Sequence, residues 1–263
     1  MQASRRPSRG FTLVEMAVVV VVMALILGSI LVPLSTQVEQ RQVVDTQRLL
    51  EDIKEALIGY ALAQPTPYLP CPDKTSNVPP GDGTPNDGVE DVVVTPGPTQ
   101  GTCVSVEGNV PWATLGLGAT DPWGNRYRYR VTQAFAQRLP APTFGFNTTG
   151  DIVVCPTSGL CGAGQALTVL PGQLNSPVAL VLSHGPNGLG AINGSTSAVN
   201  TKPPGASALG LDESANANGD ATFVSKARVT DDGSDPSPEF DDIVVWLSPH
   251  TLKNRVVAAG KLP

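Results

Sequence analysis

Charged and aromatic residues are both scarce in this sequence. Asp, Glu, Lys and Arg make up 15% of the 263 residues, aromatic residues make up 5%, and the net charge is −6. A nucleic-acid-binding surface needs a basic stripe, so no nucleic-acid partner is expected. With few aromatic side chains, a core has to be built from Val, Leu, Ile and Ala. The length allows an anchoring helix and one sizeable domain.

Motifs for catalysis and for zinc binding are also missing. There is no Gly-x-Ser-x-Gly turn. Ser183 and His184 are adjacent, so in a strand they would point to opposite faces, and the histidine could not act as base for the serine. The only other histidine is His250, and no Cys-x-x-Cys pair is present, which disfavours zinc. We therefore expect that the protein is not an enzyme.

Glycine and proline, in contrast, are abundant, with 27 and 25 residues and no regular period. This favours a loop-rich domain and excludes a collagen-like one. The stretch 191–238 is so rich in Gly, Asn, Ser, Asp and Pro that it is predicted to be a long insertion. Residues 81–91 are dense in carboxylates, which suits either a calcium loop or a solvated acidic loop. Their spacing is not that of an EF-hand, which favours the solvated loop.

One long hydrophobic run lies near the N-terminus. Residues 17–32 are all apolar except Gly28 and Ser29, and with the preceding residues the run is long enough to cross a bilayer. We predict a membrane-spanning helix over 11–34, continued by an outer half over 35–64 whose apolar stripe packs against a head domain over 65–263. The basic residues before the run place the N-terminus in the cytoplasm. They are Arg5, Arg6 and Arg9.

Glu15 is an acidic residue close to the start of this apolar helix. A carboxylate at the centre of a membrane helix costs about 2.5–3.5 kcal/mol, and less near an end, so it calls for a partner. If the chain were cut between Gly10 and Phe11, the new α-amino group of a neighbouring chain could be that partner. Such a pair would set the register between neighbouring helices. The alternative is an uncut signal anchor whose Glu15 reaches the headgroups.

The head contains several short strand signals. Tyr127, Tyr129 and Val131 alternate with arginines, which is typical of a strand with one buried face. Further candidates are 91–94, 152–154, 166–170, 178–182 and 240–247, and 252–259 is predicted to be a short helix or strand. These patterns predict an α+β fold, in which the long N-terminal helix packs on a mainly antiparallel, loop-rich sheet.

All four cysteines follow the hydrophobic run: Cys71, Cys103, Cys155 and Cys161. An even number of cysteines outside the cytoplasm predicts two disulfides. Three pairings are open, and the order along the chain favours Cys71 with Cys103 and Cys155 with Cys161.

The N-terminal segment resembles a known processing motif. Gly10-Phe11-Thr12-Leu13-Val14-Glu15, behind a basic leader and before a long apolar helix, is similar to the signal of type IV pilins and type II secretion pseudopilins. The resemblance implies that 1–10 is a leader, which a prepilin peptidase removes after Gly10. It also implies that Phe11 is methylated and that Glu15 is the assembly residue. The apolar helix would then pack in the core of a filament.

A second resemblance lies in the head. Asp121-Pro122-Trp123-Gly124-Asn125-x-Tyr127-x-Tyr129 is similar to the strand-turn motif of major pseudopilins, although Arg126 stands where that motif usually has proline. Those proteins hold calcium in the loop before their last strand. The resemblance implies a structural calcium ion at Asp241 or Asp242, with a backbone carbonyl near Leu182 or Ser183. No other cofactor is expected.

These resemblances imply a minor pilin-like subunit of a type II secretion pseudopilus. Its implied partners are other pilin-like subunits, the prepilin peptidase and the inner-membrane assembly platform. It would first be a single-pass protein of the bacterial inner membrane with its head in the periplasm, and later part of a periplasmic or surface filament. Two alternatives remain open: a minor type IV pilus subunit for adhesion or DNA uptake, and a membrane-anchored periplasmic binding protein or enzyme.

Overall fold

The computed structural model describes residues 12–77, 82–138, 144–200, 210–229 and 239–262, without the side chains of 27–36. The chain forms two compact units, residues 1–44 and 45–263. We call the second the head unit and describe each unit by itself. Helix α1, Leu13–Ala63, contributes to both.

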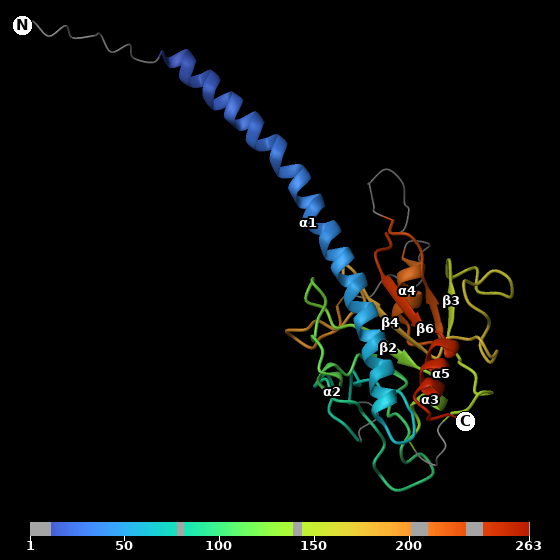
Figure 1. The fold of residues 1–263 in the computed structure, drawn as a ribbon. Helices are drawn as coiled ribbons and strands as arrows, with labels where there is room; N and C mark the ends of the chain where they lie inside the picture. The colour runs from blue at the N-terminus through green and yellow to red at the C-terminus, as the bar shows by residue number, and fades with distance from the viewer. Residues whose placement is uncertain (1–11, 78–81, 139–143, 201–209, 230–238, 263) are drawn as a thin grey trace, which may run out of the picture. The chain divides into compact units, whose positions relative to one another are not determined.

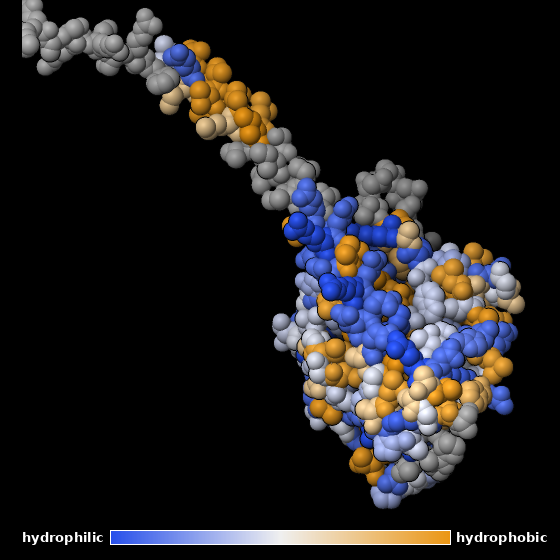
Figure 2. Space-filling view, in the orientation of Figure 1, coloured by the Kyte–Doolittle hydropathy of each residue, from blue (hydrophilic) through white to orange (hydrophobic). Residues whose placement is uncertain are grey.

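The first unit consists of the N-terminal part of α1 (Figure 1). The large apolar side chains up to Ile26 are exposed, and Figure 2 shows a mostly hydrophobic surface over this first part of the helix. Among the residues whose side chains are described, no helix is both long and apolar enough to cross a membrane. The predicted span over 11–34 includes Phe11 and the side chains of 27–34, which lie outside the described residues.

The head unit contains two sheets in the residues that the structure describes. Four strands make an antiparallel sheet in the order β1-β2-β4-β6, and β3 pairs in parallel with β5. The strands of the larger sheet are β1 Glu107–Asn109, β2 Arg128–Val131, β4 Ala179–Ser183 and β6 Ile243–Leu247; those of the smaller are β3 Val153–Cys155 and β5 Thr222–Val224. The predicted α+β fold with a mainly antiparallel sheet is confirmed.

The larger sheet buries a different cluster on each face. Because side chains alternate along a strand, Tyr129 and Val131 of β2 point to one face. There they pack with residues of α1 spaced at helical intervals, Leu50, Ile53, Leu57, Ile58 and Ala61. Figure 1 shows this part of α1 beside β2 and β4. On the opposite face, Leu180 and Leu182 pack with Ile152, Val154 and Phe223.

The described part of the head unit also contains four short helices: α2 Trp112–Leu115, α3 Gln133–Ala136, α4 Leu211–Ala217 and α5 Pro249–Ala258. The start of α5 follows from its sequence, because the Ser248 side chain accepts a hydrogen bond from the His250 amide and Pro249 occupies the first turn. The predicted insertion over 191–238 contains α4 and β5, and Ala215 and Phe223 in them are buried. Residues 201–209 and 230–238 lie outside the described residues.

Two predicted strands are wrong. Residues 166–170 form no strand, although the Leu167 amide donates a hydrogen bond to the carbonyl of Val154. Residues 91–94 form an isolated bridge, Val92 with Cys103, and no strand. A short apolar run is no evidence for a strand unless a neighbouring strand can continue the ladder.

Disulfides join Cys71 to Cys103 and Cys155 to Cys161. This is the pairing that the order of the cysteines along the chain favours. The first closes a loop with a sequence separation of 32, and the second closes one of 6.

Candidate functional site

The predicted processing residues Gly10 and Phe11 lie outside the described residues. Directly after them, Thr12 and Glu15 form a capping box at the start of α1. The Thr12 amide donates to Glu15 Oε2 at 2.9 Å, the Thr12 hydroxyl donates to the same oxygen at 3.0 Å, and the Glu15 amide donates to Thr12 Oγ1 at 3.2 Å. In the single chain, Glu15 therefore caps its own helix. Its side chain is exposed, so another chain can reach it.

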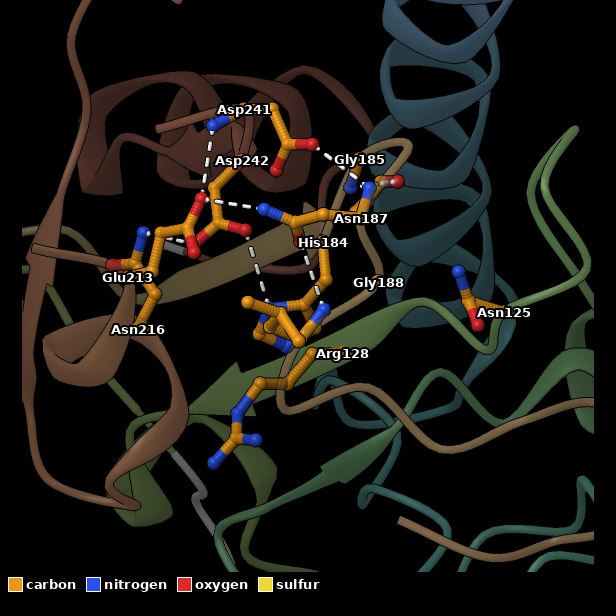
Figure 3. A network of polar contacts seen from close by, with 12 residues as sticks. Asn125, Arg128, His184, Gly185, Asn187, Gly188, Glu213, Asn216, Asp241 and Asp242 are labelled. Carbon is orange, nitrogen blue, oxygen red and sulfur yellow. Dashed lines mark hydrogen bonds and ion pairs between the residues drawn. The ribbon is translucent and has the colours of Figure 1, made fainter. Parts of the chain in front are cut away.

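A second candidate site is a cluster of three buried carboxylates in the head unit. Glu213 belongs to the first turn of α4, and Asp241 and Asp242 directly precede β6. One carboxylate oxygen from each lies within 4.8 Å of the other two. The cluster thus joins α4 to the entry of β6, and Figure 3 shows the three side chains converging there.

Neutral donors hold part of this cluster in place. Asn187 donates from its side chain to Glu213 Oε1 at 2.9 Å and from its backbone amide to Asp241 Oδ2 at 2.9 Å. Asn216 donates to Asp242 Oδ2 at 2.7 Å. Asp241 Oδ1 and Asp242 Oδ1 are buried without a hydrogen-bond partner. Two carboxylate oxygens are therefore left for a further ligand.

The electrostatics of the cluster disfavour three negative charges. Burial, together with the charges of Glu213 and Asp242, raises the pKa of Asp241 to about 8. Burial and then the charge of Asp242 raise the pKa of Glu213. His184 contacts the cluster, and its Nδ1 lies 3.3 Å from Asp242 Oδ1 without hydrogen-bond geometry. A bound cation would lower the pKa of each carboxylate.

The donor set fits a hard divalent cation such as calcium. Calcium prefers carboxylate and carbonyl oxygens, and these three side chains supply carboxylates from two segments. The loop after β4 approaches closely as well, because a Cβ on Gly185 would lie 2.4 Å from the carbonyl oxygen of Asp241. The positive φ of Gly185, 61°, also favours glycine there.

The structure brings together the two predicted residues, Asp241 and Asp242, and adds Glu213 to them. Glu213 was not predicted from the sequence, and its place in the first turn of a helix that follows Gly210 was the available signal. A backbone carbonyl near Leu182 or Ser183 was also predicted to bind the calcium ion. These two residues pair with Val244 and Ile243 in the sheet, and their part in ion binding stays a prediction.

The turn that resembles a pseudopilin motif is fastened to β4 beside this cluster. Asp121 Oδ1 accepts hydrogen bonds from the amides of Trp123 and Asn125, at 3.0 and 2.9 Å. Its Oδ2 accepts a 2.7 Å hydrogen bond from Ser183 Oγ. Ser183 therefore has a structural role, and His184 next to it belongs to the opposite face of the sheet.

Comparison with known proteins adds information about the N-terminus alone. Residues 5–31 match the model of the prokaryotic N-terminal methylation motif, which is the prepilin signal of type IV pilins and pseudopilins. The match includes Gly10, Phe11 and Glu15 and leaves the head unit uncovered. No curated protein and no solved structure matches the chain significantly.

Proposed function

We propose that this chain, whose N-terminus carries the prepilin signal, is a minor pilin-like subunit of a type II secretion pseudopilus. The observation that carries the proposal is the methylation motif over 5–31, which joins the cleavage site, Glu15 and the apolar helix in one segment. The turn at 121–129 supports a pseudopilus, because it resembles the head motif of major pseudopilins. The size of the head favours a minor subunit, since major subunits are small.

Assembly then follows from the geometry of Glu15. Before assembly, the apolar part of α1 anchors the chain in the inner membrane, with the head unit in the periplasm. After cleavage, the α-amino group of an adjacent subunit offers Glu15 a charged partner in place of the neutral donors of Thr12. The hydrogen bonds from Thr12 leave the negative charge of Glu15 without a positive partner, whereas the amino-terminus would neutralise it, so the exchange favours the filament.

A calcium ion would have a structural role in such a subunit. Glu213, Asp241 and Asp242 would hold it, and the ion would supply the positive charge that these buried carboxylates lack. By tying α4 to the start of β6, it would order the predicted insertion against the sheet.

A minor type IV pilus subunit is the main alternative, because the same signal serves both filaments. The net charge of −6 disfavours a role in DNA uptake. Deletion of the gene distinguishes the two: loss of protein secretion with normal pili supports the pseudopilus, and loss of pili or adhesion with normal secretion supports the pilus.

Mass spectrometry of the mature N-terminus tests the assignment to pilin-like subunits. We expect a chain that starts at N-methylated Phe11 when a prepilin peptidase is co-expressed. Without the peptidase, or with Gly10→Leu, the chain should keep its leader. An intact leader in the presence of the peptidase, or cleavage beyond Val32, would contradict the proposal and favour a membrane-anchored binding protein or enzyme.

A further inference from the structure

A polar cavity of about 280 Å³ lies in the head unit, apart from the N-terminal segment. Its walls come from the ends of β1 and β2, the loop after β4 and the loop after α4. The residues on which the inference depends are Arg126, Arg128, His184 and Val199. Arg128 pairs in register with Leu182, so it lies on the face of the sheet opposite to α1. Figure 3 shows Arg128 close to His184.

Arg126 is the least neutralised cation of the cavity. Its guanidinium lies 3.8 Å from the centre of the Trp112 ring, and its two terminal nitrogens donate only to the carbonyls of Ala119 and Gly194, both at 3.3 Å. Its Nε is buried without a partner. Among the described residues, Arg126 forms no ion pair with a carboxylate.

The other arginine of the cavity wall is already paired. Arg128 and Arg130 both pair with Glu107, and Arg130 also pairs with Asp151 at 3.1 Å. Among the described residues, Arg126 is therefore the arginine of the cavity wall that lacks an ion pair.

A third acid, Asp73, is close enough to influence Arg126, but it has its own donors. The amides of Asn86 and Gly88 and the side chain of Asn109 donate to it, at 2.9, 3.1 and 3.3 Å. It is therefore not a partner for the guanidinium.

His184 gives independent evidence that the cavity accepts a ligand. Its side chain is completely buried and lines the cavity, yet neither ring nitrogen has a hydrogen-bond partner. Nδ1 lies near Asp242, whereas no partner in the described part of the chain approaches Nε2 with hydrogen-bond geometry. Burying a polar group without a partner is unfavourable, and a ligand in the cavity would remove that cost.

We propose that this cavity binds a carboxylate group, with Arg126 as its main cationic partner. A carboxylate would give Arg126 the charged partner that it lacks, and its plane suits the fork of a guanidinium. The carboxylate can belong to a free small acid or to an acidic side chain of another protein. The inference does not rest on the proposed function.

NMR titration of the full-length protein in detergent micelles tests this site, with the indole N–H of Trp112 as the reporter. The probes are propionate for a free acid, an N-acetylated, C-amidated Ala-Glu-Ala peptide for a side chain, and inorganic phosphate. We expect a saturable shift with a carboxylate probe. Arg126→Gln should weaken its binding about tenfold or more, since a charged partner is lost.

Two further variants separate binding from folding. Val199→Glu places a negative charge at an exposed position of the cavity wall, so it should weaken binding without disturbing the core. Arg255→Gln removes an exposed arginine of α5 and should leave binding unchanged.

Each outcome decides the inference. Saturable binding of propionate identifies a small acid as a sufficient ligand, and binding of the peptide alone identifies a protein partner. The inference is wrong if no carboxylate probe gives a saturable shift. It is also wrong if phosphate binds more tightly than both probes, or if Arg126→Gln and Val199→Glu both bind as the unmodified chain does.

Discussion

Burial affects the carboxylates of this protein very unequally. The Glu15 side chain is exposed and accepts hydrogen bonds from Thr12 of its own chain. Asp73 and Asp241 are buried, and burial raises their pKa values to about 7 and about 8. An exposed carboxylate can therefore exchange partners at little cost, whereas a buried one keeps a proton or requires a cation.

Glu15→Gln should separate processing from assembly. The neutral side chain can still accept a hydrogen bond from Thr12, so we expect normal cleavage after Gly10. Incorporation into filaments should fall strongly, because the ion pair with the neighbouring amino-terminus is lost. Mass spectrometry of the N-terminus and immunoblots of sheared filaments measure the two effects. Glu39→Gln, also on α1, is the control, and equal incorporation of both variants would contradict the predicted role of Glu15.

Asp73 should make stability depend on pH. Its pKa is about 7 in the folded state because burial outweighs its three hydrogen bonds, whereas an aspartate in the unfolded chain has a pKa near 3.8. The folded state therefore holds an extra proton between these values. Its stabilising effect is complete below pH 3.8 and is lost as the pH rises through 7.

We therefore expect the free energy of unfolding to fall between pH 5 and 7, by at most about 1.4 kcal/mol per pH unit from this group. Asp73→Asn should remove this part of the slope in urea denaturation. Asp52→Asn, at an exposed position of α1, should retain it. Equal slopes in the two variants would show that Asp73 is ionised throughout.

At the scale of secondary structure, several elements depend on residues far away in the sequence. The last turn of α1 contains no basic residue. Instead, Lys261 near the C-terminus donates from its side chain to the carbonyls of Leu62 and Gln64. A cation is favourable at this end because it satisfies free carbonyls and opposes the negative end of the helix dipole.

Lys261→Met should therefore destabilise the head unit by about 1–2 kcal/mol. Urea denaturation at pH 7 measures the change. Lys54→Met removes a partly exposed ion pair with Glu51 on the same helix and should change stability by less than about 1 kcal/mol. If the Lys261 variant is as stable as the Lys54 variant, the contact of Lys261 with the helix end contributes nothing.

Calcium should stabilise the connection between α4 and β6. At a free concentration of about 100 times the Kd, a bound ion adds about 2.7 kcal/mol to the free energy of unfolding. We expect a chelator to lower the melting temperature and calcium to restore it. Asp241→Asn and Asp242→Asn should abolish this response, and Asp52→Asn should keep it. Identical melting of the unmodified protein with calcium and with chelator would exclude a stabilising site.

At the scale of the whole molecule, the two disulfides constrain loops of very different size. The sequence separations are 32 for Cys71 and Cys103 and 6 for Cys155 and Cys161. In the chain-entropy model, a disulfide stabilises by restricting the unfolded chain, and its effect grows with the size of the loop.

Replacing both members of a pair with serine should therefore cost more for the first disulfide than for the second. The model gives about 3.7 kcal/mol for the longer loop and about 2.2 kcal/mol for the shorter. Urea unfolding of the two double variants measures both losses. A larger loss for Cys155 and Cys161 would mean that local packing, and not the loop length, decides their contribution.

The helix and most strands of the sheet could be predicted because their signals are local. The α1 residues Leu50, Ile53 and Leu57 recur at helical spacing, and Tyr127, Tyr129 and Val131 alternate. The prediction of a strand at 166–170 was wrong because these residues do not pair with a neighbouring strand. The role of α4 and β5 in the core was missed because their polar surroundings resembled a solvated loop.

The sequence by itself determined the N-terminal signal and the fold class, and it limited the four cysteines to three possible disulfide pairings. Each depends on residue types at short spacing, which the chain carries whether or not it is folded. The tertiary structure alone decided that Glu213 joins Asp241 and Asp242, that Lys261 caps α1, and that Arg126 and His184 line one cavity. These groups are brought together by strand pairing and core packing between distant segments, and no local pattern encodes such distances.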